Sequence, residues 1–279
     1  MVPSLGALRA QPVVRHECSR QPNLRRGNRQ LKMPEESALI AETRSRLQAV
    51  AFHSQLAGQW EQKYRKPSFA YRQEIVHKFL AGTSMAATTW LDAGCGTGIL
   101  ARWLAEQGCK VEGVDAAAEM LHVARRVVSQ ASKALPVTFR QVETIEALPF
   151  PANYFDGVLC SSVLEYLPNP RACLDELGRV LRPQGVLLIS VPSARSIARM
   201  LLKTAHACTA AIGHPWPRYL SISKHEYSVR EFQELLQAVG LKMKSFVCLG
   251  TPMVKWFPQN ERLGSLLMFC ARKEDVKSW

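Results

Sequence analysis

Residues 90–98 read WLDAGCGTG, and this stretch decides the fold. An apolar run ends in Asp92, three glycines alternate with other residues, and the amphipathic segment 99–105 (ILARWLA) follows at once. Glycine lets the backbone turn sharply and approach a ligand closely, and a helix N-terminus presents free N–H groups to negative charge. The stretch therefore predicts a strand, a tight ligand-binding turn and a helix.

A second unit follows at the spacing of a nucleotide-binding fold. Residues 110–114 (KVEGV) predict a short strand that ends in Asp115, whose carboxylate can accept hydrogen bonds from ribose hydroxyls. A nicotinamide dinucleotide fold shares these parts, but its third glycine stands where this chain has Ile99. The third glycine here comes one residue earlier, at Gly98, and Asp92 interrupts the apolar strand before the turn. Both details argue against a dinucleotide site.

Four further motifs follow in order and identify a family. They are residues 146–150 (EALPF), 153–160 (NYFDGVLC), 163–167 (VLEYL) and 176–185 (ELGRVLRPQG). Together with the glycine turn, this ensemble resembles the class I S-adenosylmethionine-dependent methyltransferases. Within them it is similar to the small-molecule group that includes the ubiquinone and menaquinone biosynthesis enzymes. The resemblance covers most of the chain, from Trp60 to Ala271.

The resemblance implies that S-adenosylmethionine is the cofactor and that it binds on the matching residues. The residues that match the loop around its methionine portion are Asp92, Gly94, Cys95, Gly96 and Gly98. The residues that match its ribose and adenine sides are Asp115, Met120, Thr144 and Ile145. Cys160 and Ser161 end a predicted strand beside the expected position of the transferable methyl group. Many members have an acidic residue where Thr144 stands, and core packing is the alternative role for Met120 and Ile145. Arg72 could bind the cofactor carboxylate, or it could lie on a solvated helix face.

The predicted fold class is α/β, a doubly wound, Rossmann-like seven-stranded sheet with a helical cap and, as the resemblance implies, an antiparallel final strand. Strands are expected near residues 88–92, 110–114, 136–141, 155–160, 186–191, 241–249 and 264–271. Helices are expected near residues 98–107, 117–131, 170–181 and 229–239, the last with a capping box of Ser228 and Glu231 at its start. The expected parts are a disordered basic tail (1–32), an N-terminal helical cap (33–82), a cofactor-binding core (83–191), a lid insertion (192–228) and the C-terminal part of the core (229–279).

Composition indicates a cytoplasmic enzyme. The 279 residues are 47% hydrophobic, without an apolar run of membrane-spanning length, and the eight cysteines lack metal-binding spacing. No metal site is therefore predicted. Almost half of the formal net charge of +13 belongs to residues 1–32, where seven basic residues stand against Glu17. That segment is either an organelle-targeting peptide or a dispensable stretch before a natural start at Met33.

The lid insertion offers candidates for catalysis and for a membrane contact. A general base is needed only if the acceptor must lose a proton, and His225 is the first candidate and His214 the second. Packing is the alternative role for both histidines. Arg195, Arg199 and Lys203 are spaced four apart on a helical pattern, so this helix could also contact a membrane surface.

The predicted function is methyl transfer to a small molecule at a hydroxyl group. The alternatives are methylation of a lipid-like or quinone acceptor at carbon, a nucleic-acid methyltransferase, and a non-catalytic binding protein. Nucleic acid is disfavoured because residues 160–163 (CSSV) stand where base-amino methyltransferases carry Asn or Asp before Pro-Pro-aromatic. The chain also lacks the Pro-Cys pair that cytosine-carbon methyltransferases use as a nucleophile.

Overall fold

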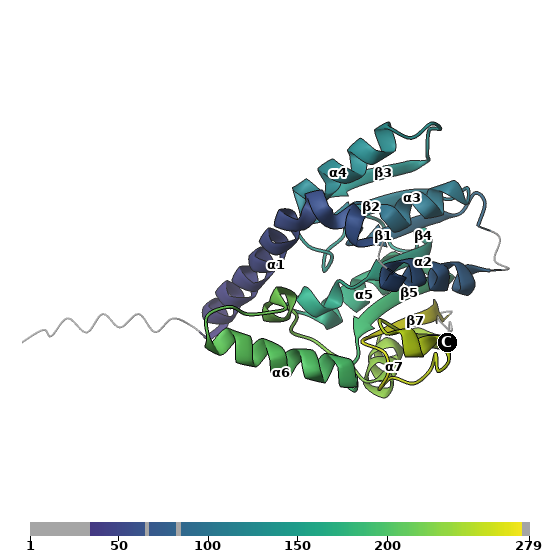
Figure 1. The fold of residues 1–279 in the computed structure, drawn as a ribbon. Coiled ribbons are helices and arrows are strands. Elements are labelled where there is room, and N and C mark those ends of the chain that lie inside the picture. The colour runs from purple at the N-terminus through teal and green to yellow at the C-terminus, as the bar shows by residue number, and fades with distance from the viewer. Residues whose placement is uncertain (1–33, 65–66, 82–84, 275–279) are drawn as a thin grey trace, which may run out of the picture.

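A seven-stranded mixed sheet forms the centre of the computed structural model, which describes residues 34–64, 67–81 and 85–274 (Figure 1). The strands are β1 (Thr89–Ala93), β2 (Lys110–Asp115), β3 (Val137–Gln141), β4 (Phe155–Ser161), β5 (Leu181–Pro192), β6 (Leu241–Leu249) and β7 (Leu266–Lys273). Their order across the sheet is β3-β2-β1-β4-β5-β7-β6. The order reverses beside β1, which pairs with β2 on one side and with β4 on the other.

The last strand runs against the others. β1 to β5 are mutually parallel, and β7 inserts antiparallel between β5 and β6. The predicted seven-stranded sheet with an antiparallel final strand is confirmed. β6 itself runs in the direction of β1 to β5, so β7 alone breaks the parallel arrangement.

Helices bury the two faces of the sheet. The described helices are α1 (Pro34–Tyr64), α2 (Pro67–Leu80), α3 (Ile99–Glu106), α4 (Ala118–Ser129), α5 (Pro170–Val180), α6 (Ile197–Ala211) and α7 (Val229–Ala238), of which α1 and α6 extend beyond the sheet. Successive strand residues point to opposite faces, so Trp90 and Leu159 pack with α2 and α3, whereas Leu91, Val158 and Cys160 pack with α5 and α7. The predicted capping box of α7 is present, with Ser228 bonded to the Glu231 amide and the Glu231 carboxylate bonded back.

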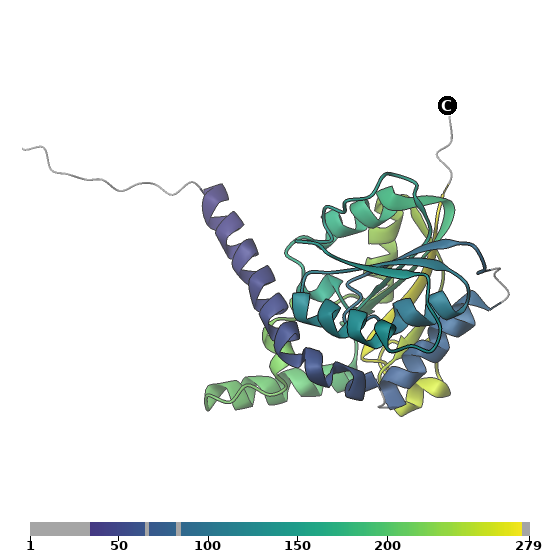
Figure 2. The ribbon, with the colours of Figure 1, turned by 90° about the horizontal axis from the view of Figure 1, so that it is seen from above.

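The region expected as one N-terminal helical cap consists of two helices with different roles. α2 belongs to the sheet layer, because its Ile75 and Val76 lie in the same apolar cluster as Trp90. α1 packs across α4 through Ala57 and Met120. Figures 1 and 2 show α1 and α6 reaching beyond the sheet on the same side of the molecule.

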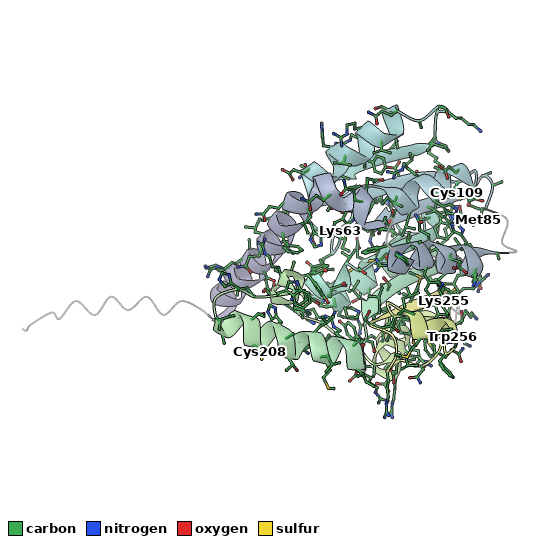
Figure 3. The ribbon with its side chains drawn as sticks, in the orientation of Figure 1. Lys63, Met85, Cys109, Cys208, Lys255 and Trp256 are labelled. Atoms are coloured by element: carbon green, nitrogen blue, oxygen red, sulfur yellow. The ribbon has the colours of Figure 1, made fainter. Side chains whose placement is uncertain are left out.

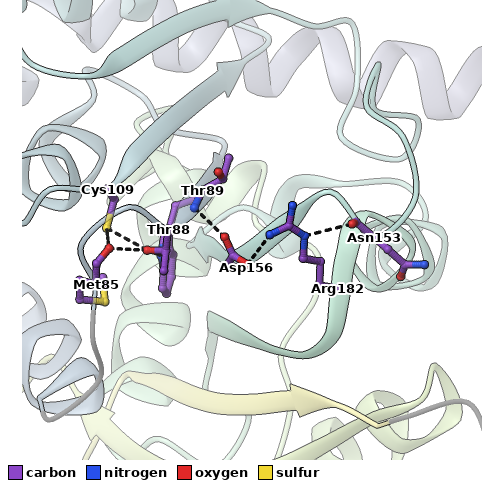
Figure 4. A network of polar contacts seen from close by, with 8 residues as sticks. Met85, Thr88, Thr89, Cys109, Asn153, Asp156 and Arg182 are labelled. Carbon is purple, nitrogen blue, oxygen red and sulfur yellow. Dashed lines mark hydrogen bonds and ion pairs between the residues drawn. The ribbon is translucent and has the colours of Figure 1, made fainter.

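A network of hydrogen bonds and ion pairs links the amino ends of β1, β4 and β5, opposite the carboxyl ends of the strands (Figure 4). The Thr89 amide at the start of β1 donates to Asp156 Oδ2 (2.8 Å), and Arg182 of β5 forms an ion pair with the same carboxylate. Thr88 Oγ1 and Cys109 Sγ both donate to the Met85 carbonyl. This network fixes how the strands are aligned with one another along their length. The carboxyl ends of the strands take no part in it and remain available for a site.

The last two expectations for the fold concern membrane-spanning helices and the basic tail. Among the described residues, no helix combines the length and the apolar character needed to cross a bilayer. The basic tail expected at residues 1–32 lies outside the described residues.

Candidate active site

A cavity of about 690 Å³ lies where the strand order reverses. Its floor consists of residues that follow the carboxyl ends of β1, β2, β4 and β5, which is where open α/β sheets bind ligands. α1 and α6 supply its walls, together with the short 3₁₀ helices η1 (Leu164–Tyr166) and η2 (Arg218–Ser221). Lys63, near the end of α1, is one of the lining residues (Figure 3).

The glycine turn after β1 forms part of the floor and depends on a left-handed backbone. Gly94 has φ +74°, and a Cβ there would stand 2.4 Å from Val163 Cγ2. The amides of Gly94 and Cys95 both donate to the Val114 carbonyl, at 2.8 and 2.9 Å. Gly96 has φ +54° and exposes its backbone to the cavity. Only glycine fits the first position, and the second lets a ligand approach the main chain.

Asp115 ends β2 and presents a fixed carboxylate to the cavity. One oxygen accepts from the Gly96 amide (2.8 Å) and the other from the Ala117 amide (2.8 Å). Burial raises the pKa of this carboxyl, and the two amide hydrogen bonds oppose that rise. Each carboxylate oxygen has a second lone pair, so Asp115 can still accept hydrogen bonds from a ligand.

Asp92 lies behind the turn and does not line the cavity. Its side chain is buried, and Oδ2 has no hydrogen-bond partner among the described residues. Burial, with a smaller contribution from the charge of Asp115, raises the pKa of Asp92 to about 7. Thr97 Oγ1 is likewise buried without a described partner, and Gly98 serves as the left-handed N-cap of α3.

The residues predicted to contact the adenine line the same cavity as Asp115. They are Met120, Thr144 and Ile145. Met120 and Ile145 are almost fully buried and also line the cavity, so each can pack in the core and still contact an adenine. The Thr144 hydroxyl is engaged with Glu146, because it accepts from the Glu146 amide at 3.1 Å.

The predicted methyl side differs in one residue. Cys160 points to the α5 face, where its free thiol lies beside the free thiol of Cys173, and it is fully buried away from the cavity. Strand alternation turns the next residue the other way, and Ser161 lines the cavity. Arg72 reaches the cavity and donates to Ser161 Oγ (3.4 Å), while its buried Nε has no described partner.

Neither predicted base lines the cavity. His225 lies 3.0 Å from the Leu167 carbonyl through Nε2, and His214 is on an exposed turn after α6. Catalytic roles for the two histidines stay predictions.

The cavity is lined by a different ionisable group, the buried carboxylate of Glu165, which has two arginines nearby. Glu165 in η1 is 4% exposed and lines the cavity, and its Oε2 has no described hydrogen-bond partner. Burial raises the pKa of Glu165 to about 7 despite the positive charges of Arg72 and Arg199. Arg199 is held by Glu226 (Nε to Oε1, 2.7 Å) and by Ser223 Oγ (2.7 Å).

Aromatic rings from α1 and η1 complete this side. His53 packs edge-on against Tyr166 (ring centroids 4.8 Å apart) and Trp60 (5.6 Å), and its Nδ1 lies 2.8 Å from the Ala49 carbonyl. Burial lowers the pKa of His53, so the neutral ring is favoured. Among the described residues, no group of three or more His, Cys, Asp and Glu side chains could hold a metal ion.

Comparison with known proteins agrees with the geometry. Residues 91–189 match a family model described as a methyltransferase domain. The chain is therefore similar to methyltransferases over residues 91–189. Its core therefore has the fold and motif order that the sequence predicted.

Curated relatives and solved structures extend the likeness beyond that core. A ubiquinone biosynthesis O-methyltransferase of Xanthomonas oryzae pv. oryzae is 30% identical over 154 residues, which are 51% of this chain and 64% of that enzyme. The match thus spans less than two thirds of that relative's length. One of Xylella fastidiosa is 29% identical over 180 residues (63% of this chain, 70% of the relative).

Solved structures share the fold at low identity. A magnesium protoporphyrin IX methyltransferase from Synechocystis PCC 6803 with bound SAH has TM-score 0.62 and 18% identity, over 80% of this chain and 96% of that one. The cyclase SpnF has TM-score 0.54 and 18% identity, over 73% of this chain and 80% of that one. Because the second protein is named for a different reaction, the fold by itself does not determine the chemistry.

Proposed function

We propose that this protein is an S-adenosylmethionine-dependent methyltransferase that methylates a hydroxyl group of a small molecule. The observation that carries the proposal is one cavity that contains both the Gly94–Gly96 turn with Asp115 and the buried carboxylate of Glu165, whose Oε2 has no described partner. The first set suits a nucleoside cofactor, and the second suits removal of a proton from a hydroxyl.

The residues present fit the cofactor. Gly96 leaves the backbone open to the cavity, and the Asp115 carboxylate is held by two amides with lone pairs to spare for the ribose hydroxyls. Arg72 has a buried, unpartnered Nε at the cavity and could bind a carboxylate. Bound S-adenosylmethionine would supply an activated methyl group. The chain itself then needs to orient the acceptor, exclude water and accept a proton.

Glu165 is the proposed general base. A carboxylate whose pKa is near 7 can take a proton from a hydroxyl at neutral pH far better than an ordinary surface glutamate. The segment that carries Glu165 packs directly on the glycine turn, because Val163 touches Gly94. This proximity to the glycine turn supports the proposed role of Glu165 close to the cofactor.

Calorimetry with S-adenosylhomocysteine tests cofactor binding. We expect binding by the full chain and a loss of about 10- to 100-fold in affinity for Asp115→Ala, because the ribose donors would lose their partner. Asp175→Ala removes an exposed aspartate on α5 and should leave the affinity unchanged. Absence of binding by the unaltered protein would refute the cofactor assignment.

Turnover tests the base. Labelled cofactor and a panel of phenols, quinone precursors, sugars and acyl-carrier-bound acids would identify an acceptor, and product analysis would separate oxygen from carbon methylation. The rate should rise with pH through about 7, where Glu165 loses its proton. Glu165→Gln should lower kcat by about 10²–10⁴-fold and abolish this rise. His225→Ala should keep the pH profile; the opposite result for the two variants would return the role to His225.

A further inference from the structure

The exposed apolar side chains of this protein are concentrated on two segments. Ten large apolar side chains stand exposed in the described residues, and eight of them lie within residues 197–216 and 253–257. The eight are Ile197, Met200, Leu201, Ile212, Trp216, Met253, Trp256 and Phe257. Such a concentration marks an interaction surface. We call these two segments the apolar face.

The basic residues of α6 do not lie free beside the apolar side chains. Arg199 and Lys203 both pair with Glu226, at 2.7 and 3.1 Å, and Arg195 just before the helix pairs with Glu261 (3.1 Å). α6 contains no acidic residue and no further lysine or arginine. Its outward side is consequently apolar and almost free of charge, the reverse of an ordinary surface helix.

Hydrogen bonds join the two segments. The Ile197 amide donates to the Arg262 carbonyl (3.0 Å), and Ser193 Oγ donates to the Glu261 carbonyl (2.9 Å), so α6 is joined to the loop that carries Trp256. In Figure 2, α6 and the segment after β6 lie along the same edge of the molecule. Figure 3 shows Cys208 of α6 and Trp256 on the same lower side of the fold.

The surroundings of this face are positively charged. Residues 192–227 and 250–264 contain seven lysines and arginines against two glutamates, and both glutamates are in ion pairs. Two of the apolar side chains are tryptophans, which favour the boundary between water and lipid. Anionic lipid offers both the negative charge and the apolar depth that this combination requires.

We propose that the apolar face docks on an anionic membrane surface. A second copy of the chain is the other possible occupant, but a two-fold symmetric contact would bring the same positive segments against each other. The cavity adjoins this face, because Trp216 of one segment lines it together with Arg218, just after that segment, and Gly250, just before the other. An acceptor could therefore reach the cavity from the lipid side, a consequence that rests on the proposed function.

Vesicle co-sedimentation of the full chain tests the proposal with a matched pair of variants. Leu201 on α6 and Leu47 on α1 are both 62% exposed, so Leu201→Glu and Leu47→Glu add the same charge at equal exposure. Leu47 belongs to α1, outside the two segments of the apolar face, and Figure 2 shows the N-terminal part of α1 rising away from α6. Any contribution of the basic tail is the same in both variants.

We expect binding to phosphatidylcholine vesicles that contain about 25% phosphatidylglycerol, and much weaker binding without it. Leu201→Glu should lower the partition coefficient at least tenfold, whereas Leu47→Glu should change it less than twofold. Both should retain S-adenosylhomocysteine affinity, which separates this result from the proposed function. Equal partition of the two variants would overturn the proposal. So would a dimer in light scattering that Leu201→Glu dissociates, because the face would then bind a second copy.

Discussion

Asp92→Asn should change how the stability of this protein depends on pH. The pKa of Asp92 is raised to about 7 in the folded protein, against about 3.9 for an unperturbed aspartate. The folded state therefore binds more protons than the unfolded state between these values. The free energy of unfolding consequently falls as pH rises through this interval.

The magnitude follows from the difference of about three pKa units. Each unit corresponds to about 1.4 kcal/mol, so the ionised form costs about 4 kcal/mol above pH 7, and about 2.5 kcal/mol of that develops between pH 5 and pH 8. Asparagine cannot ionise, and any cost of its amide would be the same at every pH. Thermal unfolding should show a Tm difference between variant and unaltered protein that grows by about 5–10 °C from pH 5 to pH 8.

The control is Asp175→Asn, which removes one negative charge from an exposed position on α5. Its Tm should follow the unaltered protein across the same pH range. The raised pKa of Glu165 contributes equally to all three proteins and cancels in the comparison. Parallel Tm curves for Asp92→Asn and the unaltered protein would refute the reasoning, because the buried carboxyl would then have an ordinary pKa.

Two further changes test the turn and a helix cap. Gly94→Ala should lower Tm and abolish S-adenosylhomocysteine binding in calorimetry, because the new Cβ would stand 2.4 Å from Val163 Cγ2. The control is Gly213→Ala, where φ is also positive but no atom lies within 4 Å of the new Cβ. This control should show only the smaller cost of backbone strain. Ser228→Ala removes half of the capping box with Glu231 and should cost about 1 kcal/mol of unfolding free energy in denaturant titration, with unchanged ligand affinity. An unaltered stability in either case would contradict the corresponding contact.

The sequence predicted most of the fold because its signals are local. Glycine turns and capping residues mark the ends of the strands and helices, so β2 and β6 begin where expected. The start of β5 could not be found this way. Leu181 looks like the end of a helix before Pro183, but it pairs with Phe155 across a register shift. Only the neighbouring strand reveals that Leu181 is already extended.

The sequence indicated the residues around the glycine turn of the cavity but not those on its other side, for a related reason. Gly94 and Asp115 stand in motifs with fixed spacing, whereas His53, Glu165 and Arg199 meet through the packing of α1, η1 and α6. Glu165 was visible in the motif at 163–167, but its burial without a partner is a tertiary property. Of Cys160 and Ser161, which were both predicted at this end of β4, only Ser161 lines the cavity, because successive strand residues point to opposite faces.

The position of β7 has a consequence for biosynthesis. β6 pairs with no strand of the described sheet except β7, and β7 comes last along the described chain. On the ribosome, the parallel half from β1 to β5 can assemble while residues 266–273 are still in the exit tunnel. A chain halted before Leu266 would therefore expose one open edge on β5 and leave β6 unpaired, and unpaired strand edges promote aggregation. β7 is thus the strand that joins the two halves of the described sheet.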